Sequence, residues 1–168
     1  MARSLQFQAI AKPVLMMLVG MVFVAISPPT LGADMAGPAD VIDGDTVVIH
    51  DMEISLYGID APELKQTCKT RKGKNQHCGD LARQSLVGLV RGRKIICTDI
   101  KPDPDGHPAG LCFIGPISIN EQMVADGWAM ADRRTGDDFV RAETFAKNRQ
   151  EGFWRTEFLA PWEWRKQK

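Results

Sequence analysis

The chain has 168 residues, in which 21 lysines and arginines balance 21 aspartates and glutamates. This length suits one domain with a hydrophobic core and is short for two. A balanced charge excludes proteins that are held on nucleic acid by an overall excess of cations. Any binding of a polyanion must therefore be local.

The first 33 residues have the pattern of an export signal. Arg3 and Lys12 give a positive start, and a long uncharged apolar run follows them. Small and helix-breaking residues come next, which predicts cleavage near Ala33. An uncleaved anchor is the alternative, but the apolar run is shorter than the roughly 20 residues of a spanning helix. We expect a periplasmic or secreted protein with a signal peptide at 1–33 and a single domain at 34–168.

All four cysteines follow this segment, at Cys68, Cys78, Cys97 and Cys112. An even number behind an export signal indicates two disulfides. Three connectivities are possible. We favour Cys68–Cys78, which closes a short polar loop, and Cys97–Cys112, which joins two segments expected to be neighbouring strands. The alternative is a zinc site that includes His77, although the chain has no C-x-x-C pair.

The first half of this domain reads as strands followed by a helix. After a short polar lead-in at 34–38, alternating runs rich in valine and isoleucine predict two or three strands between residues 40 and 59. Residues 65–79 are lysine-rich and have almost no apolar side chains. We expect a solvated loop there, or alternatively a basic loop that faces phosphate beside the acidic residues. A helix is expected from Asp80 to a stop at Gly92.

Two further strands are expected at 93–100 and 111–114, with a loop rich in proline and glycine between them. Ser118 and Glu121 form the pattern of a capping box, which predicts a second helix. A last helix is expected over 137–150. This order suits an α+β fold, mainly β with helices: an OB-fold five-stranded barrel with about three α-helices.

Four carboxylates stand close together in the predicted strand region. Asp43 and Asp45 lie in "VIDGDTVV", and Asp60 and Glu63 lie in "YGIDAPEL". Each motif alone is weak, because D-G-D is common in hairpin turns and D-x-P-E at helix starts. Strand ends on one rim of a barrel would bring Asp45, Asp60 and the carbonyl of Ala61 together, and calcium prefers such oxygen ligands. Glu63 would then orient or deprotonate a water.

These motifs and the segments after them resemble the staphylococcal nuclease (thermonuclease) family over essentially the whole of residues 40–155. The resemblance rests on "VIDGDTVVI", "YGIDAPEL", "CGDLARQSL", "INEQMVADGWA" and "AETFAKNRQEGFW". The ending "PWEWR" and the four cysteines resemble the secreted branch found in Gram-negative bacteria. The resemblance implies an OB-fold with three helices, one Ca²⁺ ion and hydrolysis of phosphodiester bonds in DNA and RNA. We expect a monomer with no membrane span after processing.

The acidic half of the family's site is complete in this chain. Asp45 and Asp60 match the calcium carboxylates, and Ala61 matches the residue whose carbonyl binds the ion. Glu63 matches the general base or water-orienting acid. The resemblance therefore implies metal binding at these positions.

The phosphate side departs from the family pattern. Ser55 and His107 stand where the family has two arginines, and Asp132 and Thr135 stand where it usually has tyrosines. Arginine stabilises the charge of a transferring phosphoryl group with a planar, permanently charged fork. Serine offers a neutral hydroxyl, and histidine is only partly charged near neutral pH. Both are weak substitutes, so we expect hydrolysis that is weak or lost.

Other side chains leave alternatives open. Lys65, Arg133 and Arg134 are candidates to compensate for the missing arginines, although solvated surface charge is the commoner role. The aromatic residues between Phe153 and Trp164 either pack over the barrel or stack on bases. Two hypotheses follow. One is a secreted phosphodiesterase of weak or altered activity, and the other is an inactive binding module for nucleic acid, an exopolysaccharide-related glycan or a protein.

Overall fold

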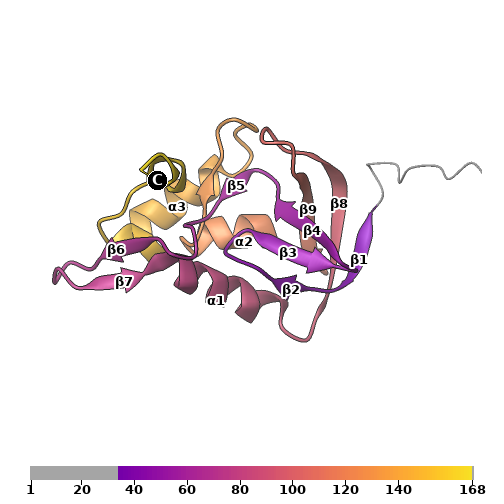
Figure 1. The fold of residues 1–168 in the computed structure, drawn as a ribbon, viewed down its shortest axis with the longest axis horizontal. Helices are drawn as coiled ribbons and strands as arrows, with labels where there is room; N and C mark the ends of the chain where they lie inside the picture. The colour runs from indigo at the N-terminus through magenta and orange to yellow at the C-terminus, as the bar shows by residue number, and fades with distance from the viewer. Residues whose placement is uncertain (1–33, 168) are drawn as a thin grey trace, which may run out of the picture.

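The computed structural model describes residues 34–167, so the predicted signal peptide lies outside the described residues. Helices pack around a β-barrel (Figure 1). The strands are β1 (Met35–Pro38), β2 (Asp40–Val41), β3 (Thr46–Ile49), β4 (Met52–Leu56), β5 (Ile59–Asp60), β6 (Thr67–Lys69), β7 (Asn75–His77), β8 (Lys94–Pro102), β9 (Pro108–Ile114), β10 (Ile117–Ser118) and β11 (Met130–Ala131). The helices are α1 (Cys78–Val90), α2 (Ile119–Ala125), α3 (Val140–Arg149) and α4 (Pro161–Arg165), with a 3-10 turn η1 (Gly152–Arg155).

A bent first strand closes the barrel almost completely. The main sheet has the order β1-β8-β9-β4-β3-β2. Ala39 alone separates β1 from β2, so one stretch of chain pairs with β8 at one end of the sheet and with β3 at the other. If this stretch is counted as one strand, the barrel has five strands, with β4 and β9 parallel. The predicted OB-fold class is confirmed.

The segment at 34–38, expected as a short polar lead-in, contains strand β1 at Met35–Pro38. Its short, weakly apolar sequence carries little strand signal, and pairing with β8 supplies its hydrogen bonds. In β3 and β4, alternate side chains are buried as expected of half-buried strands. This alternation places Ile54 and Leu56 in the core and leaves Ser55 facing outward.

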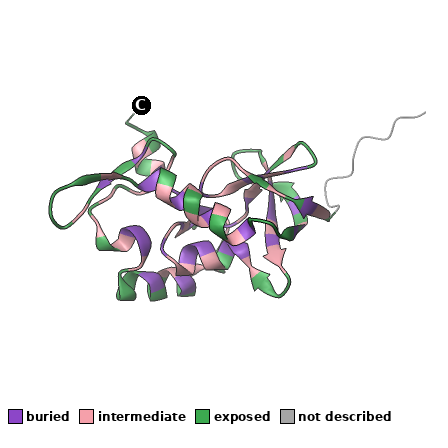
Figure 2. Ribbon diagram, turned by 90° about the horizontal axis from the view of Figure 1, so that it is seen from below, coloured by how far each residue is buried: buried purple, intermediate pink, exposed green. Residues whose placement is uncertain are grey.

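The helices follow the predicted order with one addition. Helix α2 has the expected cap, in which the Ser118 hydroxyl accepts a hydrogen bond from the Glu121 N–H. The buried residues of helix α1 recur at helical spacing, at Cys78, Gly79, Ala82, Leu86 and Val90. Figure 2 shows buried and exposed residues alternating along the helices. The described residues hold four α-helices instead of about three, because a short α4 begins at Pro161. None of the helices in residues 34–167 is long and apolar enough to cross a membrane.

Both predicted disulfides are present. Cys97 and Cys112 are direct partners in the β8–β9 ladder, so their bond links two neighbouring strands. Cys68 of β6 is bonded to Cys78, which begins α1 directly after β7, so this bond links the hairpin to the helix. The segment at 65–79, expected as a solvated loop, is largely exposed, but it contains the paired strands of a hairpin.

The aromatic tail packs on this hairpin. Phe153 is fully buried beside the Cys68–Cys78 disulfide. Its ring centroid lies 5.3 Å from that of Trp154 and 4.5 Å from that of Phe158. These rings form a second, smaller apolar cluster, so packing rather than base stacking explains this part of the tail.

Asn120 fixes helix α2 to the barrel, and sequence analysis missed it. The side chain is fully buried. Its Oδ1 accepts a hydrogen bond from the Cys112 N–H at 2.9 Å, and its Nδ2 donates to the carbonyls of Tyr57 and Gly110 at 2.8 and 3.2 Å. One amide thus satisfies backbone groups of β9 and of the loop after β4.

Replacing Asn120 by alanine is expected to lower the free energy of unfolding by about 3 kcal/mol, because buried backbone groups lose their partners. Urea denaturation measures the change. Asn148→Ala, at an exposed position of α3, serves as the control and should change stability by less than about 0.5 kcal/mol. Equal effects of the two substitutions would contradict the assigned role.

Candidate active site

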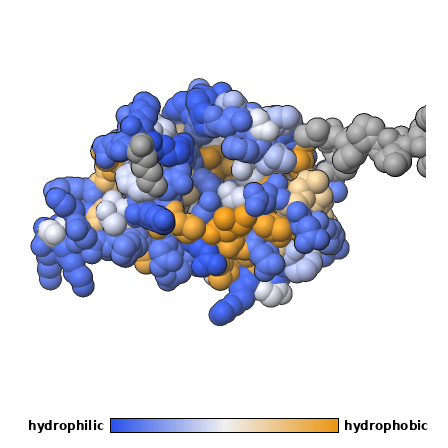
Figure 3. Space-filling model, in the orientation of Figure 1, coloured by the Kyte–Doolittle hydropathy of each residue, from blue (hydrophilic) through white to orange (hydrophobic). Residues whose placement is uncertain are grey.

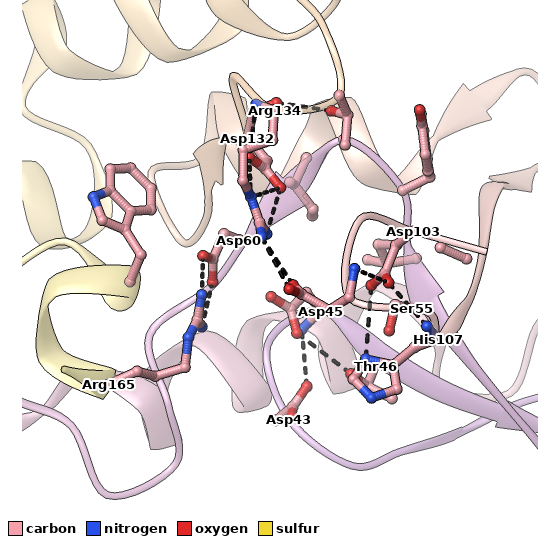
Figure 4. A pocket seen from close by; sticks show the side chains of 18 of the residues that line it. Asp43, Asp45, Thr46, Ser55, Asp60, Asp103, His107, Asp132, Arg134 and Arg165 are labelled. Atoms are coloured by element: carbon pink, nitrogen blue, oxygen red, sulfur yellow. Dashed lines mark hydrogen bonds and ion pairs between the residues drawn. The ribbon is translucent and has the colours of Figure 1, made fainter. Parts of the chain in front are cut away.

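A cleft of about 630 Å³ opens where the β2–β3 turn, β5, the β8–β9 loop and α4 meet (Figure 4). It brings together the predicted residues Asp45, Ser55, Asp60, Glu63 and His107. The cleft is strongly acidic. Its permanent cations are Arg134, Arg165 and Lys166, against seven carboxylates: Asp43, Asp45, Asp60, Glu63, Asp103, Asp105 and Asp132.

The turn between β2 and β3 positions Asp45. The Asp45 N–H donates to Oδ1 of Asp43 at 3.1 Å, which holds the turn. A Cβ at Gly44 would lie 2.6 Å from that of Ala61 and 2.8 Å from that of Ala82, so only glycine permits this close approach. Oδ2 of Asp45 accepts a hydrogen bond from the Ala61 N–H at 2.5 Å. The D-G-D turn and the D-x-P-E loop are thereby in direct contact.

The surroundings of Asp45 favour its neutral form. Burial is the main cause that raises the pKa of Asp45 well above its ordinary value, and the carboxylates of Asp43 and Asp60 add to it. The hydrogen bond from Ala61 acts in the opposite direction. A cation beside Asp45 would favour the charged form.

Arg165 of helix α4 pairs with both acids of the D-x-P-E motif. Its Nη1 and Nη2 donate to Oδ1 and Oδ2 of Asp60 at 3.0 and 2.6 Å. Nη1 also donates to Oε1 of Glu63 at 2.8 Å. Burial raises the pKa of Asp60, whereas Arg165 lowers it. The same contacts raise the pKa of Arg165, so this guanidinium is charged throughout the working pH range.

Sequence analysis missed Arg165, which lies 105 residues from Asp60 in the chain. Gln66 connects the two regions. This buried side chain accepts a hydrogen bond from the Glu63 N–H at 3.2 Å and donates to the carbonyl of Leu159 at 2.7 Å. The D-x-P-E loop therefore holds the tail that carries α4.

Ser55 and His107 line the same cleft as the acids. Ser55 lies on β4, between Thr46 of β3 and Ala109 of β9. Nδ1 of His107 lies 3.8 Å from a carboxylate oxygen of Asp103, which is too long for a hydrogen bond. The His107 side chain is 72% exposed. Both replacement residues therefore lie in the cleft that contains the predicted acidic residues.

Of the three candidate compensating cations, Arg134 alone lines the cleft. Its guanidinium is held by Asp132 at 2.9–3.1 Å and by Asp105 at 3.0–3.1 Å. Arg133 instead pairs with a glutamate of α3 at 2.6 Å. Lys65 is exposed and lies outside the cleft lining. The one candidate compensating arginine that reaches the site, Arg134, is thus already paired with two carboxylates.

The carboxylates are of the kind that hard cations prefer, but their present arrangement does not make a metal site. In residues 34–167, no group of three or more histidine, cysteine, aspartate or glutamate side chains is placed to hold an ion. The Arg165 guanidinium donates hydrogen bonds to both carboxylate oxygens of Asp60, and the Ala61 N–H donates one to Oδ2 of Asp45. A cation at this place would compete with the Arg165 guanidinium.

Comparison with known proteins assigns the family. Residues 53–156 match the family model described as staphylococcal nuclease homologue. The chain belongs to the staphylococcal nuclease family. It is 32% identical over 125 residues to the succinoglycan biosynthesis protein ExoI of Rhizobium meliloti (strain 1021), an alignment that covers 72% of this chain and 65% of that protein.

Two further relatives of this staphylococcal nuclease family member come from other groups of organisms. The protein ParB of Escherichia coli is 30% identical over 145 residues, with 76% of each chain covered. The probable staphylococcal-like nuclease CAN3 of Oryza sativa subsp. japonica is 30% identical over 125 residues, which cover 73% of this chain and 30% of that protein. The chain thus spans slightly less than two thirds of the Rhizobium relative and under a third of the rice relative.

In the absence of metal, Asp45→Asn is expected to raise the thermal midpoint at pH 8. Because the folded-state pKa of Asp45 is raised, the wild type loses stability as pH rises from about 4, the ordinary aspartate value, through the raised pKa. Asparagine keeps an acceptor for the Ala61 N–H and carries no charge. Differential scanning fluorimetry in EDTA from pH 4 to 8 measures the difference.

The gap between Asp45→Asn and the wild type should widen as pH rises. The exposed Asp40 provides a matched control, and Asp40→Asn should change the thermal midpoint at pH 8 by less than Asp45→Asn does. A gap that stays constant, or that closes at high pH, would show that Asp45 is not held near its neutral form.

Proposed function

We propose that the protein is an exported, calcium-dependent phosphodiesterase of DNA or RNA whose turnover is slow. The observation that carries this proposal is one cleft that holds Asp45, Asp60 and Glu63 together with Ser55 and His107. Membership of the staphylococcal nuclease family supports the class of reaction and of substrate, because the family typically uses Ca²⁺ and acts on nucleic acid.

Each residue of the cleft has a defined part in the proposal. Asp45, Asp60 and the carbonyl of Ala61 would hold the ion, which supplies positive charge against the phosphate oxygens. Glu63 orients or deprotonates the attacking water once its Oε1 is free of Arg165. The Ser55 hydroxyl and the His107 imidazole donate to the phosphate oxygens in place of arginines.

The slow rate follows from the charges around the phosphate position. A transition-state arginine is typically worth about 10³ to 10⁵ in rate. Ser55 cannot supply that charge, and His107 supplies it only in part. Arg134 and Arg165 are each held by two carboxylates, so neither is free to bind phosphate in the present arrangement.

Arg165 also controls access to the metal position in this proposal. Its bidentate contact with Asp60 occupies both oxygens of a carboxylate that the ion needs. We therefore expect calcium and the Arg165 guanidinium to compete for Asp60. Metal binding then requires α4 or its arginine side chain to move.

The alternative is a binding module without hydrolysis, and the charge of the cleft favours it. Seven carboxylates against three permanent cations repel a polyanion unless a metal ion is bound. The name of the Rhizobium relative associates that protein with succinoglycan, which makes a glycan one candidate ligand for such a module. The two functions differ in whether any phosphodiester bond is cleaved.

Ser55→Arg combined with His107→Arg is expected to raise kcat/KM for DNA by at least about 100-fold, because the variant supplies two charged forks to the phosphate. Cleavage of a fluorophore-quencher oligonucleotide with Ca²⁺ measures the rate. Asp45→Ala combined with Glu63→Ala is the inactive control. A wild type no faster than this control would leave the binding module as the better account, and a wild type as fast as the arginine variant would refute slow turnover.

Arg165→Gln is expected to bind Ca²⁺ at least about 10-fold more tightly than the wild type, because the competing guanidinium is gone. Isothermal titration calorimetry without nucleic acid gives the affinity. Lys166→Gln is a matched control, since Lys166 also lies on this tail but pairs with Glu163 at 2.9 Å. Equal affinities of the two variants would mean that loss of general positive charge, and not release of Asp60, sets the metal affinity.

A further inference from the structure

A second hollow of the molecule has the opposite charge to the cleft. A groove of about 570 Å³ lies between the β6–β7 hairpin and the chain from the end of α3 to residue 156. No carboxylate lines it. The uncharged polar residues Thr70, Gln76, Gln150 and Thr156 complete the lining around five cations: Arg71, Lys72, Lys74, Arg149 and Arg155.

The walls of this basic groove are held in place. The disulfide at Cys68 fixes the base of the hairpin. Lys69 of β6 and Glu157 of the tail exchange backbone hydrogen bonds, both at 2.9 Å. Arg71 donates a side-chain hydrogen bond to Gln150 across the groove. These contacts hold together the two segments that carry the cations.

Among the described residues, the cations of the groove form fewer ion pairs than the arginines of the cleft. Within residues 34–167, Arg71, Lys72 and Lys74 form no ion pair. Arg149 forms an ion pair of 3.3 Å with Glu151, and its guanidinium lies over the Phe145 ring. Arg155 donates its Nε to a backbone carbonyl. The hairpin turn is exposed (Figure 2), and its projecting end at the left of the molecule is hydrophilic (Figure 3).

We propose that this basic groove is a second anion-binding site, which holds the phosphodiester backbone of a nucleic acid. Guanidinium forks and lysine ammonium groups are the usual partners of backbone phosphates. A nucleic acid carries a negative charge at every nucleotide, and this dense spacing suits cations crowded into one groove. The inference rests on the proposed function in taking nucleic acid as the ligand, but binding in the groove needs neither metal nor hydrolysis.

The acidic cleft and the basic groove interact with a polyanion in opposite ways. The acidic cleft repels a nucleic acid before a metal ion is bound, whereas the basic groove attracts it. The groove and the cleft share no lining residue. The tail connects them, because Glu157 pairs with the hairpin and Arg165 enters the cleft a few residues later. The groove thus supplies affinity, and the cleft contributes chemistry.

The basic loop at 65–79 was expected either as a solvated loop or as a loop that faces phosphate beside the acids. The structure places three of its cations, Arg71, Lys72 and Lys74, on a separate groove. Arg149 and Arg155 line the same groove, and sequence analysis did not connect them to this loop. Both arginines lie about 80 residues after the hairpin in the chain. The hydrogen bond from Arg71 to Gln150 joins residues that are 79 positions apart. Packing of the tail on the hairpin creates the site.

The test is DNA binding by a variant that carries Arg71→Glu, Lys72→Glu and Lys74→Glu. Fluorescence anisotropy with a labelled 20-nucleotide strand, in EDTA to prevent hydrolysis, gives Kd at several salt concentrations. We expect Kd to rise at least about 10-fold and the slope of log Kd against log salt to fall by about 2, as lost phosphate contacts require. Circular dichroism and the thermal midpoint check that the variant folds.

A control variant carries Arg91→Glu, Arg93→Glu and Lys94→Glu, which change the net charge equally at exposed positions after α1 and at the start of β8. We expect its Kd to rise by less than about 3-fold. Equal losses in the two variants, or no loss in the hairpin variant, would overturn the proposal. Equally tight binding of polygalacturonate by the wild type would also overturn it, because the groove would then recognise polyanions in general.

The same measurements separate this inference from the proposed function. In EDTA, Asp45→Ala combined with Glu63→Ala should bind DNA no more weakly than the wild type, because it removes two repelling carboxylates from the cleft and leaves the groove unchanged. Hairpin-dependent binding by a wild type that never cleaves would leave the groove in place and remove the phosphodiesterase proposal. Cleavage with an unchanged KM in the hairpin variant would support the phosphodiesterase proposal and remove the proposed role of the groove.

Discussion

Carboxylate groups gathered in a half-buried cleft need positive charge beside them, and this constraint shapes the site. Arg165 supplies that charge to Asp60 and Glu63 from the far end of the chain. It can do so because Gln66 holds the backbone at Leu159, just before α4. The C-terminal helix is therefore part of the construction of the cleft, and not a passive cover over the barrel.

The same constraint explains why the acidic residues alone do not show which chemistry the site performs. A guanidinium and a calcium ion satisfy the same carboxylates, so Arg165 stabilises the site without metal and opposes the ion that hydrolysis needs. Arg134 is held in a similar way by Asp132 and Asp105. A cleft in which both arginines neutralise carboxylates has little charge left for phosphate, which makes a separate basic surface useful to any activity on nucleic acid.

The sequence alone predicted those structural features that depend on residues close together in the chain. The strand alternation, the Ser118 cap and the spacing of the cysteines gave the OB-fold class and both disulfides. It did not predict Arg165, whose contact with Asp60 spans 105 residues, or Asn120, whose partners are backbone groups. Nor did it predict strand β1, which depends on pairing with β8 more than on its own apolar pattern. Contacts that arise only when distant segments pack carry no local signal.

A crystal structure of the wild type grown with millimolar calcium tests the central claim most directly, because it shows whether the metal and Arg165 use the same carboxylate. The account predicts an ion bound by Asp45 and Asp60, with the Arg165 guanidinium moved away from both oxygens of Asp60. An ion at that position while Arg165 keeps both of its present bonds to Asp60 would contradict the competition on which the account depends.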